Sequence, residues 1–284
     1  MQAIETIQQA LRRACLLLSD SSDSAALDSE ILLQFVLAKN RTYLFTWGDK
    51  SLTSSEALKF QQLLELRLQG HPIAHLIGER EFFSLPFKVN ATTLIPRPDT
   101  EVLVETALAL ALPANAKVLD LGTGTGAIAL SLAHEQPQWQ VSAVDKVAAA
   151  VALARENQQM LGLNQVVICQ SDWFSAISGQ HFDLIVSNPP YIDEEDHHLN
   201  QGDVRFEPLS ALTAPDNGYR DLFHIADLSR QYLLNDGYLL MEHGFEQGAI
   251  LRQQLKDLGY QAVRTIKDYG DNERCTLAQW VNCD

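Results

Sequence analysis

The chain has 284 residues with 46% hydrophobic side chains, and its 36 Asp and Glu against 21 Lys and Arg give a net charge of −15. This length and apolar content predict one large or two ordinary globular domains and exclude a disordered chain. Polyanion binding draws most of its free energy from Lys and Arg at phosphates. The acidic balance therefore argues against direct broad nucleic-acid binding and leaves only a local basic patch open.

The sequence also bears on membranes and redox chemistry. No apolar run approaches the length of a membrane span, and no signal-peptide cleavage pattern follows the apolar residues 14–18. We therefore expect no membrane partner and, by default, a cytoplasmic location. The four cysteines form no Cys-x-x-Cys pair, which favours reduced thiols over a zinc knuckle or a redox motif.

Residues 1–70 are predicted to form a small helical domain. Apolar residues recur there at helical spacing, first at Ile7, Leu11, Ala14 and Leu18. Residues 53–56 fit a capping box before an apolar helix, and Gly70 fits its stop. These apolar stripes are most simply core, and on their spacing alone a partner-docking role is the lesser interpretation.

Residues 71–97 are predicted to form a linker that contains a β-hairpin, with its break at residues 85–86. His71 and His75 are interpreted as loop or hairpin residues, because no third ligand lies at matching spacing, and we expect no metal site. Pro98 suits the first turn of a following helix, where Asp99 and Glu101 lie favourably near the positive end.

From residue 117 the pattern alternates strand and helix, which predicts an α/β fold with a mostly parallel sheet covered by helices on both faces. The predicted strands are 117–121, 139–144, 166–170, 183–187, 238–243, 261–266 and 275–281. The last two are joined by residues 267–274, too few for a crossover helix, so the seventh strand should be antiparallel to its neighbour.

A glycine-rich turn follows the first of these strands, with Asp120 at its mouth. The loop residues expected to contact a ligand are Gly122, Thr123, Gly124, Thr125 and Gly126. The same spacing also fits a dinucleotide fingerprint. Asp120 favours a different ligand, because its carboxylate would repel a pyrophosphate and attract the ammonium and sulfonium groups of S-adenosylmethionine.

Polar residues follow the next two strands as well. Asp145 ends the second strand, where it could accept both ribose hydroxyls of an adenosine or simply cap the next helix. Asp172 and Trp173 follow the third strand, where the carboxylate could accept from the adenine amine and the indole could stack on the ring. A tryptophan at such a position is also ordinary core.

The fourth strand ends in Asn188, Pro189, Pro190 and Tyr191. Proline rings restrict the backbone, so Asn188 is expected to be held rigidly at the sheet edge where ligands bind. The Asn188 side-chain carbonyl and the Pro189 backbone carbonyl could accept both hydrogens of one planar NH₂ group, with the Tyr191 ring over its face. In isolation these residues are better interpreted as the end of a strand.

All four features fall at the same sheet edge, and together they predict an S-adenosylmethionine-dependent N-methyltransferase with Asn188 beside both donor and acceptor. An adenine-N6 nucleic-acid methyltransferase could use the same amide clamp, but residues 71–284 carry −14 of the net charge. A non-enzymatic adenosine-binding module or a dinucleotide oxidoreductase would have no use for that clamp.

Several segments carry a family resemblance: residues 95–101, 120–130, 188–192, 207–208 and 268–274. They resemble the bacterial peptide chain release factor glutamine methyltransferases over the whole chain. The resemblance implies a helical domain, residues 1–70, that helps to dock the release factor, a hairpin linker, residues 71–97, and a seven-stranded Rossmann-like class I methyltransferase domain, residues 98–284. It also implies methylation of the side-chain amide nitrogen (N5) of the Gln in the Gly-Gly-Gln motif of class 1 release factors.

Ribosomal-protein glutamine methyltransferases share the Asn-Pro-Pro-Tyr motif, but residues 98–101 (Pro-Asp-Thr-Glu) favour the release-factor branch. Residues 214–220 depart from the Gly-Gly-x-Asp-Gly-Leu pattern of many relatives, which leaves a role for Arg220 open. Residues 193–198 are expected to form a solvated loop whose side chains point in different directions. Glu242 and His243 either line the methionine end of the pocket or form a hydrogen-bonded structural pair.

Overall fold

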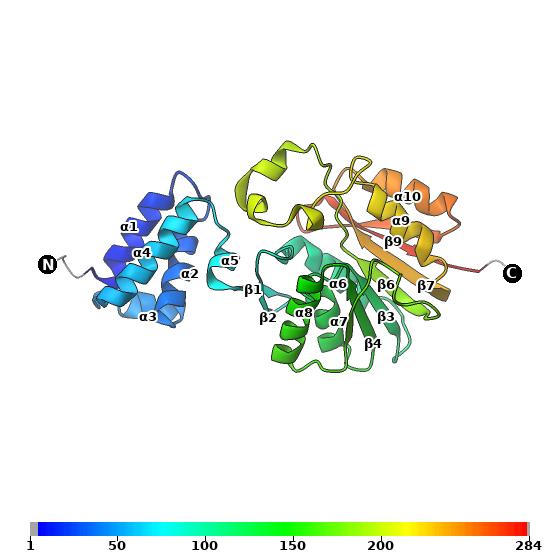
Figure 1. Ribbon diagram of the computed structural model, residues 1–284, viewed down its shortest axis with the longest axis horizontal. Helices are drawn as coiled ribbons and strands as arrows, with labels where there is room; N and C mark the ends of the chain where they lie inside the picture. The colour runs from blue at the N-terminus through cyan, green and yellow to red at the C-terminus, as the bar shows by residue number, and fades with distance from the viewer. Residues whose placement is uncertain (1–4, 283–284) are drawn as a thin grey trace. The chain divides into compact units, whose positions relative to one another are not determined.

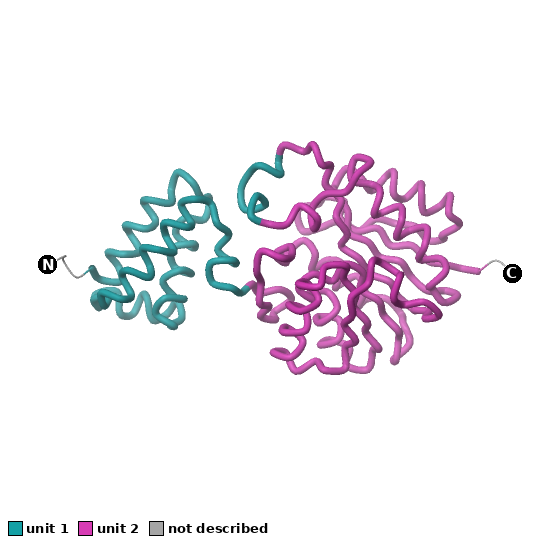
Figure 2. Tube along the Cα trace, in the orientation of Figure 1, with its two compact units in different colours: residues 1–79, 198–206 teal, residues 80–197, 207–284 magenta. Residues whose placement is uncertain are grey.

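The computed structural model describes residues 5–282, which divide into two compact units (Figure 2). The first unit comprises the chain up to residue 79 together with residues 198–206, and the second comprises residues 80–197 and the chain from residue 207 onward. The sequence instead suggested parts that end at residues 70 and 97, and that tripartite division stays a prediction.

The first unit is helical. Its helices are α1 (Ile7–Leu18), α2 (Ala25–Leu37), α3 (Arg41–Thr46), α4 (Ser54–Leu68) and α5 (Ile73–Ile77). The capping box at α4 is present, because the Glu56 backbone N–H donates to Thr53 Oγ1 (3.2 Å) and the Thr53 N–H donates to Glu56 Oε2 (2.7 Å). Gly70, at φ +93°, ends this helix as predicted.

The hairpin β1 (Glu79–Phe82) and β2 (Leu85–Lys88) is present, but its turn differs from the prediction. Phe83 and Ser84 form the turn, with φ of 50° and 60°, and Pro86 lies within a strand. Two left-handed residues suit the twist of a tight hairpin, yet neither is a glycine or asparagine that would signal such a turn. The interpretation of His75 as a loop or hairpin residue is also wrong, because it lies in α5.

The second unit contains a seven-stranded sheet of order β5-β4-β3-β6-β7-β9-β8 (Figure 1). The strands are β3 (Lys117–Leu121), β4 (Gln140–Asp145), β5 (Val167–Gln170), β6 (Phe182–Ser187), β7 (Leu233–Glu242), β8 (Gln261–Lys267) and β9 (Glu273–Gln279). Strand β9 pairs antiparallel with both β7 and β8, while the other pairs are parallel. The predicted seven strands and the antiparallel last strand are therefore confirmed.

Helices cover both faces of this sheet (Figure 1). They are α6 (Glu101–Leu108), α7 (Ala127–Glu135) and α8 (Ala148–Leu161) on one face, and α9 (Arg220–Ser229) and α10 (Gly248–Asp257) on the other. Successive side chains of β6 point to opposite faces of the sheet and so contribute to two apolar cores. Leu184 and Val186 pack in the core on the α6–α8 face, and Ile185 packs in the core on the α9–α10 face. Because apolar side chains pack on both faces of the sheet, the polar residues of the second unit's site come from the ends of its strands, at the sheet edge.

The segment after β6 contains short 3-10 turns rather than the plain loop that the sequence suggested. They are η2 (His197–Asn200), η3 (Gly202–Phe206) and η4 (Leu209–Ala211), and a further one, η1 (Pro98–Thr100), precedes α6. Across residues 5–282, no helix combines the length and apolar character that a membrane crossing requires.

Candidate active site

A cavity of about 480 Å³ opens at the carboxyl edge of the parallel strands in the second unit. The predicted site residues that line it come from four strand ends: Gly122, Thr123, Gly124, Thr125, Asp145, Asp172, Trp173, Asn188 and Pro190. Residues far apart in the sequence thus meet at one edge, as expected of an open α/β sheet. Four other predicted residues, Asp120, Gly126, Pro189 and Tyr191, are not among the lining residues that the structure describes.

The glycine-rich loop is held close to the neighbouring strand. The N–H groups of Gly122 and Thr123 both donate to the Val144 carbonyl at 2.9 Å. Gly122 has φ +72°, and a Cβ there would lie 3.5 Å from the Trp173 ring. Gly126 serves packing instead, because a Cβ on it would approach the Leu130 side chain at 3.0 Å. The loop therefore brings bare backbone to the cavity wall, where a ligand can approach closely.

Asp145 is fixed by the loop that it faces. Its Oδ2 accepts from the Gly124 N–H at 2.9 Å and its Oδ1 from the Val147 N–H at 2.8 Å. Burial raises the pKa of this carboxyl despite those bonds. A carboxylate has about four acceptor positions, so Asp145 keeps acceptor capacity for a hydroxyl donor in the cavity beyond its backbone hydrogen bonds. This acceptor therefore fits the ribose hydroxyls of an adenosine.

Asp172 and Trp173 form the next part of the wall. Lys146 Nζ lies 3.0 Å from Asp172 Oδ2, and both side chains are largely exposed. Trp173 has φ +48°, which is uncommon for a bulky residue, and its carbonyl accepts from Ser171 Oγ at 2.7 Å. The indole lies against the glycine loop, since a Cβ on Gly122 would be 3.5 Å from it, and Trp173 also lines the cavity.

Asp120 lies beneath the loop and is fully buried. Its Oδ2 accepts from Thr123 Oγ1 at 2.6 Å, whereas Oδ1 has no hydrogen-bond partner among residues 5–282. Burial raises the pKa of Asp120 to about 7, which the Thr123 hydroxyl partly counteracts. An unpaired buried carboxylate oxygen is costly, and a cationic ligand above the loop would offset that cost. This too fits S-adenosylmethionine.

Asn188 follows β6, whose end is tied to β3 by the 2.8 Å bond from Ser187 Oγ to the Leu121 carbonyl. The Asn188 Nδ2 donates to Thr100 Oγ1 at 3.2 Å. The amide nitrogen thus faces Thr100, and because Asn188 also lines the cavity, its Oδ1 can serve as an acceptor there. Pro190 lines the cavity beside it, while Pro189 is buried behind.

Tyr191 lies elsewhere than expected. Its hydroxyl donates to Glu242 Oε1 at 3.1 Å, and its ring packs against the second core. The expected placement of the ring over the acceptor is therefore not what the structure shows, since the chain turns after Pro190 and directs the ring into the protein. His243, whose two ring nitrogens lie 2.8 Å from Gly244 O and Thr276 Oγ1, forms structural hydrogen bonds rather than a cavity wall.

Cavity residues that the sequence did not assign include Thr93, Arg97, Thr100 and Arg220. Arg97 pairs with the buried Glu207, which also accepts from the Ile95 N–H at 2.8 Å. Arg97 and Thr100 lie in the segment 95–101 and Glu207 lies in the segment 207–208, so the sequence pattern marked these three residues without assigning their roles. Arg220, left open by the sequence, lines the cavity and contacts Asp221 Oδ1 at 3.1 Å.

Gly218 controls how closely the loop before α9 approaches the Asn-Pro-Pro-Tyr segment. It has φ +82°, and a Cβ there would lie 2.0 Å from the Tyr191 carbonyl oxygen. We expect Gly218→Ala to lower the free energy of unfolding by about 2–3 kcal/mol, measured by urea denaturation. Gly162→Ala is the matched control, because Gly162 has φ +72° but no atom near its Cβ position. Equal losses of unfolding free energy in the two variants would show that the close approach of Gly218 to Tyr191 does not contribute to the cost.

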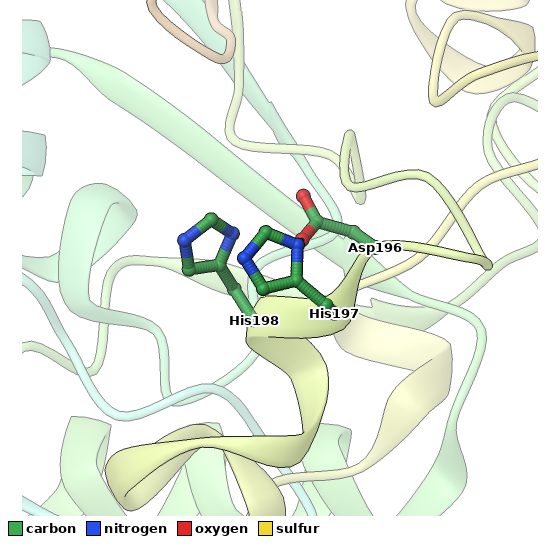
Figure 3. A group of neighbouring side chains, drawn as sticks. All are labelled: Asp196, His197 and His198. Carbon is green, nitrogen blue, oxygen red and sulfur yellow. The ribbon is translucent and has the colours of Figure 1, made fainter.

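A second polar group lies in the segment after β6 (Figure 3). Ligand atoms of Asp196, His197 and His198 come within 4.8 Å of one another, with His197 Nδ1 3.7 Å from Asp196 Oδ1. The expectation that these side chains diverge is therefore wrong, because the chain enters the tight turn of η2 here. Exposed Asp and His side chains gather in this way without an ion, so the group carries no functional argument.

Known proteins resemble both parts of the chain. A family described as PrmC N-terminal domain matches residues 9–78, and one described as Methyltransferase small domain matches residues 98–205. Among solved structures, a methyltransferase from Pyrococcus furiosus aligns with a TM-score of 0.55 at 17% identity, covering 78% of this chain and 98% of that one. A 16S rRNA methyltransferase from Thermus thermophilus, solved with AdoMet and guanosine, aligns with a TM-score of 0.51 at 19% identity, covering 71% and 49%. At these identities the likeness shows the fold alone.

Curated relatives are much more similar. A release factor glutamine methyltransferase from Shewanella oneidensis is 61% identical over 275 residues, which cover 97% of this chain and 96% of the relative. The protein of the same name from Escherichia coli is 52% identical over 92% and 94%. The aligned regions include most of both units and the strand ends that build the cavity. The chain is a methyltransferase and belongs to the release factor glutamine methyltransferase family.

Proposed function

We propose that this enzyme methylates the side-chain amide nitrogen (N5) of the Gln in the Gly-Gly-Gln motif of class 1 peptide chain release factors. The methyl donor is S-adenosylmethionine. The observation that carries the proposal is the Asn188 amide, which donates from Nδ2 to Thr100 and thereby leaves Oδ1 as an acceptor at the cavity. An acceptor-only group is what an NH₂ substrate needs, because a donor there would meet its hydrogens.

The residues of the cavity divide into donor and acceptor sides. On the side of the methyl donor, Asp145 would hold the ribose, and Asp172 and Trp173 would hold the adenine. The loop that begins at Gly122 would contact the remaining part of the donor molecule, and Asp120 would supply negative charge below that loop. S-adenosylmethionine supplies an electrophilic methyl group when it is bound. The chemistry of these side chains matches the ribose, adenine and cationic groups of that donor.

On the acceptor side, the protein's task is positioning. A carboxamide nitrogen is a weak nucleophile, because its lone pair is delocalised into the carbonyl. Two acceptors, Asn188 Oδ1 and the Pro189 carbonyl, would hold both hydrogens of the substrate amide and aim the nitrogen at the donor. No general base is required, because the nitrogen becomes acidic once it is alkylated and its proton can then pass to solvent.

The helical first unit is proposed to help dock the release factor. It exposes large apolar side chains, among them Leu16 (75% exposed), Leu58 (61%), Phe45 (63%) and Trp47 (52%). Protein interfaces favour aromatic and aliphatic side chains of this kind over charged ones. The reaction would take place in the cytoplasm, where release factors act.

The direct test is transfer of labelled methyl from S-adenosylmethionine to purified class 1 release factors. We expect label in the intact factor and none in a factor whose Gly-Gly-Gln glutamine is replaced by Ala. Equal label in both acceptors would refute the substrate assignment. Parallel reactions with a ribosomal-protein fraction and with adenine-containing nucleic acid would reveal either of the alternative acceptors.

Asp145→Ala is expected to weaken S-adenosylmethionine binding by about 10- to 100-fold, the effect of losing charge-assisted hydrogen bonds of about 1.5–3 kcal/mol. The change removes the acceptor for the ribose and frees the Gly124 N–H that orders the loop. Isothermal titration calorimetry measures the affinity. Asp257→Ala, at the exposed end of α10, is the control. Unchanged affinity in Asp145→Ala would remove Asp145 from the donor site.

A further inference from the structure

We propose that Gln247 is a positioning residue that holds the Tyr191 carbonyl and thereby fixes where the Asn188 and Pro189 acceptors lie at the cavity. The inference rests on the proposed function, in which these two acceptors hold the substrate amide. It assigns a function to the N-cap residue of α10, which no sequence motif had marked.

The Asn-Pro-Pro-Tyr segment depends on its two ends for its position. Pro189 and Pro190 have no backbone N–H group, so neither can donate a hydrogen bond that would hold the middle of the segment. The front end is fixed by the sheet, because Ser187 pairs in register with Leu121 of β3 and Met241 of β7. The rear end lies beyond β6, so other contacts must hold it.

Gln247 supplies such a contact with its side-chain amide. Its Nε2 donates to the Tyr191 carbonyl at 3.0 Å and to the Asn217 carbonyl at 3.4 Å. Its Oε1 accepts from the Gly244 N–H at 2.9 Å, so both ends of the amide have a partner of the right kind. Gln247 is 8% exposed, so water competes little for these hydrogen bonds. The amide therefore ties the Asn-Pro-Pro-Tyr segment to the loop before α9 and to the residues after β7.

The Tyr191 carbonyl has no substitute for this contact. Among residues 5–282, Gln247 is the only hydrogen-bond donor to it. The Tyr191 hydroxyl has a partner of its own, Glu242 Oε1 at 3.1 Å, so the side chain and the carbonyl of Tyr191 are held separately. Gly218 closes the space around the contact, because a Cβ there would lie 2.0 Å from the Tyr191 carbonyl oxygen and 2.9 Å from Gln247 Nε2.

The contact bears on catalysis through the Pro189 carbonyl. That carbonyl and Asn188 Oδ1 can hold both hydrogens of one NH₂ group only if their separation and directions stay constant. Because the proline rings fix φ at two successive residues, a shift at Tyr191 passes along the segment and is not absorbed within it. A displaced pair of acceptors would aim the substrate nitrogen poorly, which lowers the rate of transfer and leaves the affinity for the methyl donor unchanged.

The test uses two substitutions in the full-length enzyme. Gln247→Glu keeps the acceptor for the Gly244 N–H, but its ionised carboxylate has no proton to donate to Tyr191. Gln247→Met keeps the length of the side chain and removes both kinds of hydrogen bond. We expect each variant to lower kcat by roughly 10- to 100-fold, the scale of a misplaced reacting group, and either one suffices for the test. S-adenosylmethionine affinity should be retained, because Gln247 is not among the described residues that line the cavity.

Tyr260→Phe is the matched control for lost stability. The Tyr260 hydroxyl donates to the Ala226 carbonyl at 2.8 Å, so this change also removes a side-chain donor from a buried backbone carbonyl of the second unit. We expect a similar loss of unfolding free energy with wild-type kcat. Gln253→Met controls for the substitution itself, because the exposed Gln253 side chain lies on the same helix and donates to Asp257 Oδ1 at 2.8 Å.

A measurement independent of turnover observes the carbonyl directly. Tyr191 is the only tyrosine followed by isoleucine, so enzyme labelled with carbonyl-¹³C tyrosine and ¹⁵N isoleucine gives one correlated NMR signal, from the peptide group between Tyr191 and Ile192. We expect the carbonyl signal to shift in Gln247→Met and in Gln247→Glu, where the hydrogen bond is lost. The signal should stay at its wild-type position in Gln253→Met.

Four outcomes would overturn the inference: wild-type kcat in the Gln247 variants, an equal loss of kcat in Tyr260→Phe, a fall in S-adenosylmethionine affinity that matches the fall in kcat, or an unshifted Tyr191 carbonyl signal in the Gln247 variants. Failure of the proposed function would appear separately, as absence of methyl transfer to the release factor by the wild-type enzyme. In that case the carbonyl signal still decides whether Gln247 holds the segment.

Discussion

Replacing Asn188 with Ala is expected to lower kcat for release-factor methylation by at least about 100-fold. The substitution removes the Oδ1 acceptor at the cavity and leaves the substrate amide free to rotate. Because the carboxamide is a poor nucleophile, little rate survives once the nitrogen is no longer aimed. Single-turnover transfer of labelled methyl at saturating S-adenosylmethionine measures this step without the influence of donor binding.

The result separates the two roles assigned to Asn188, which also borders the donor side of the cavity. We expect donor affinity to change much less than kcat, because Asp145, Asp172 and Trp173 are retained. Asn164→Ala, at an exposed position before β5, controls for loss of an amide elsewhere in the same unit. Lost donor binding with normal turnover at saturating donor would make Asn188 a donor ligand and not a substrate clamp.

The sheet could be predicted because its signals are local. Apolar runs of four to six residues mark the strands, and the short connection of residues 267–274 determines that β9 is antiparallel. The ligand edge follows from the topology, since parallel strands place their carboxyl ends together. Asp145, Trp173 and Asn188 could thus be expected near one another without any knowledge of their side-chain contacts.

What the sequence could not provide depends on contacts between distant residues. Asn188 and Thr100 are 88 residues apart, and Tyr191 and Glu242 are 51 apart, so no periodic pattern joins them. The direction of the Tyr191 ring depends on the turn of the chain after Pro190. The conformational propensities of the residues do not specify that turn. The hairpin turn was misplaced because its left-handed residues are Phe83 and Ser84, where a sequence signal would require glycine or asparagine.

Asp120→Asn is expected to stabilise the ligand-free enzyme at pH 8 and to weaken its binding of S-adenosylmethionine. The carboxyl is fully buried, and its pKa rises from the ordinary 3.8 to about 7. A raised carboxyl pKa favours the folded protein only while the group is protonated, so stability is lost as the pH rises from about 4 through 7. At about 1.4 kcal/mol per pKa unit, the loss is on the order of 4 kcal/mol.

Urea denaturation between pH 4 and 8 measures this effect. Wild type should lose stability across that window more steeply than Asp120→Asn. Asp183→Asn, on β6, is the matched control, because Asp183 is only half-buried and its Oδ2 accepts from the Lys117 N–H at 2.8 Å. Equal pH dependence in wild type and Asp120→Asn would show that another group causes the loss.

The same substitution removes the negative charge beneath the glycine loop. Ligand-free Asp120→Asn should therefore be more stable than wild type at pH 8. Its melting temperature should nevertheless rise less when S-adenosylmethionine is added, since at a given concentration a ligand that binds more weakly stabilises the folded protein less. A gain in the stability of the ligand-free enzyme together with a loss of donor affinity would show that the Asp120 charge serves ligand binding and not folding. If Asp120→Asn lost stability and kept its affinity for S-adenosylmethionine, Asp120 would have a structural role and no role in binding the donor.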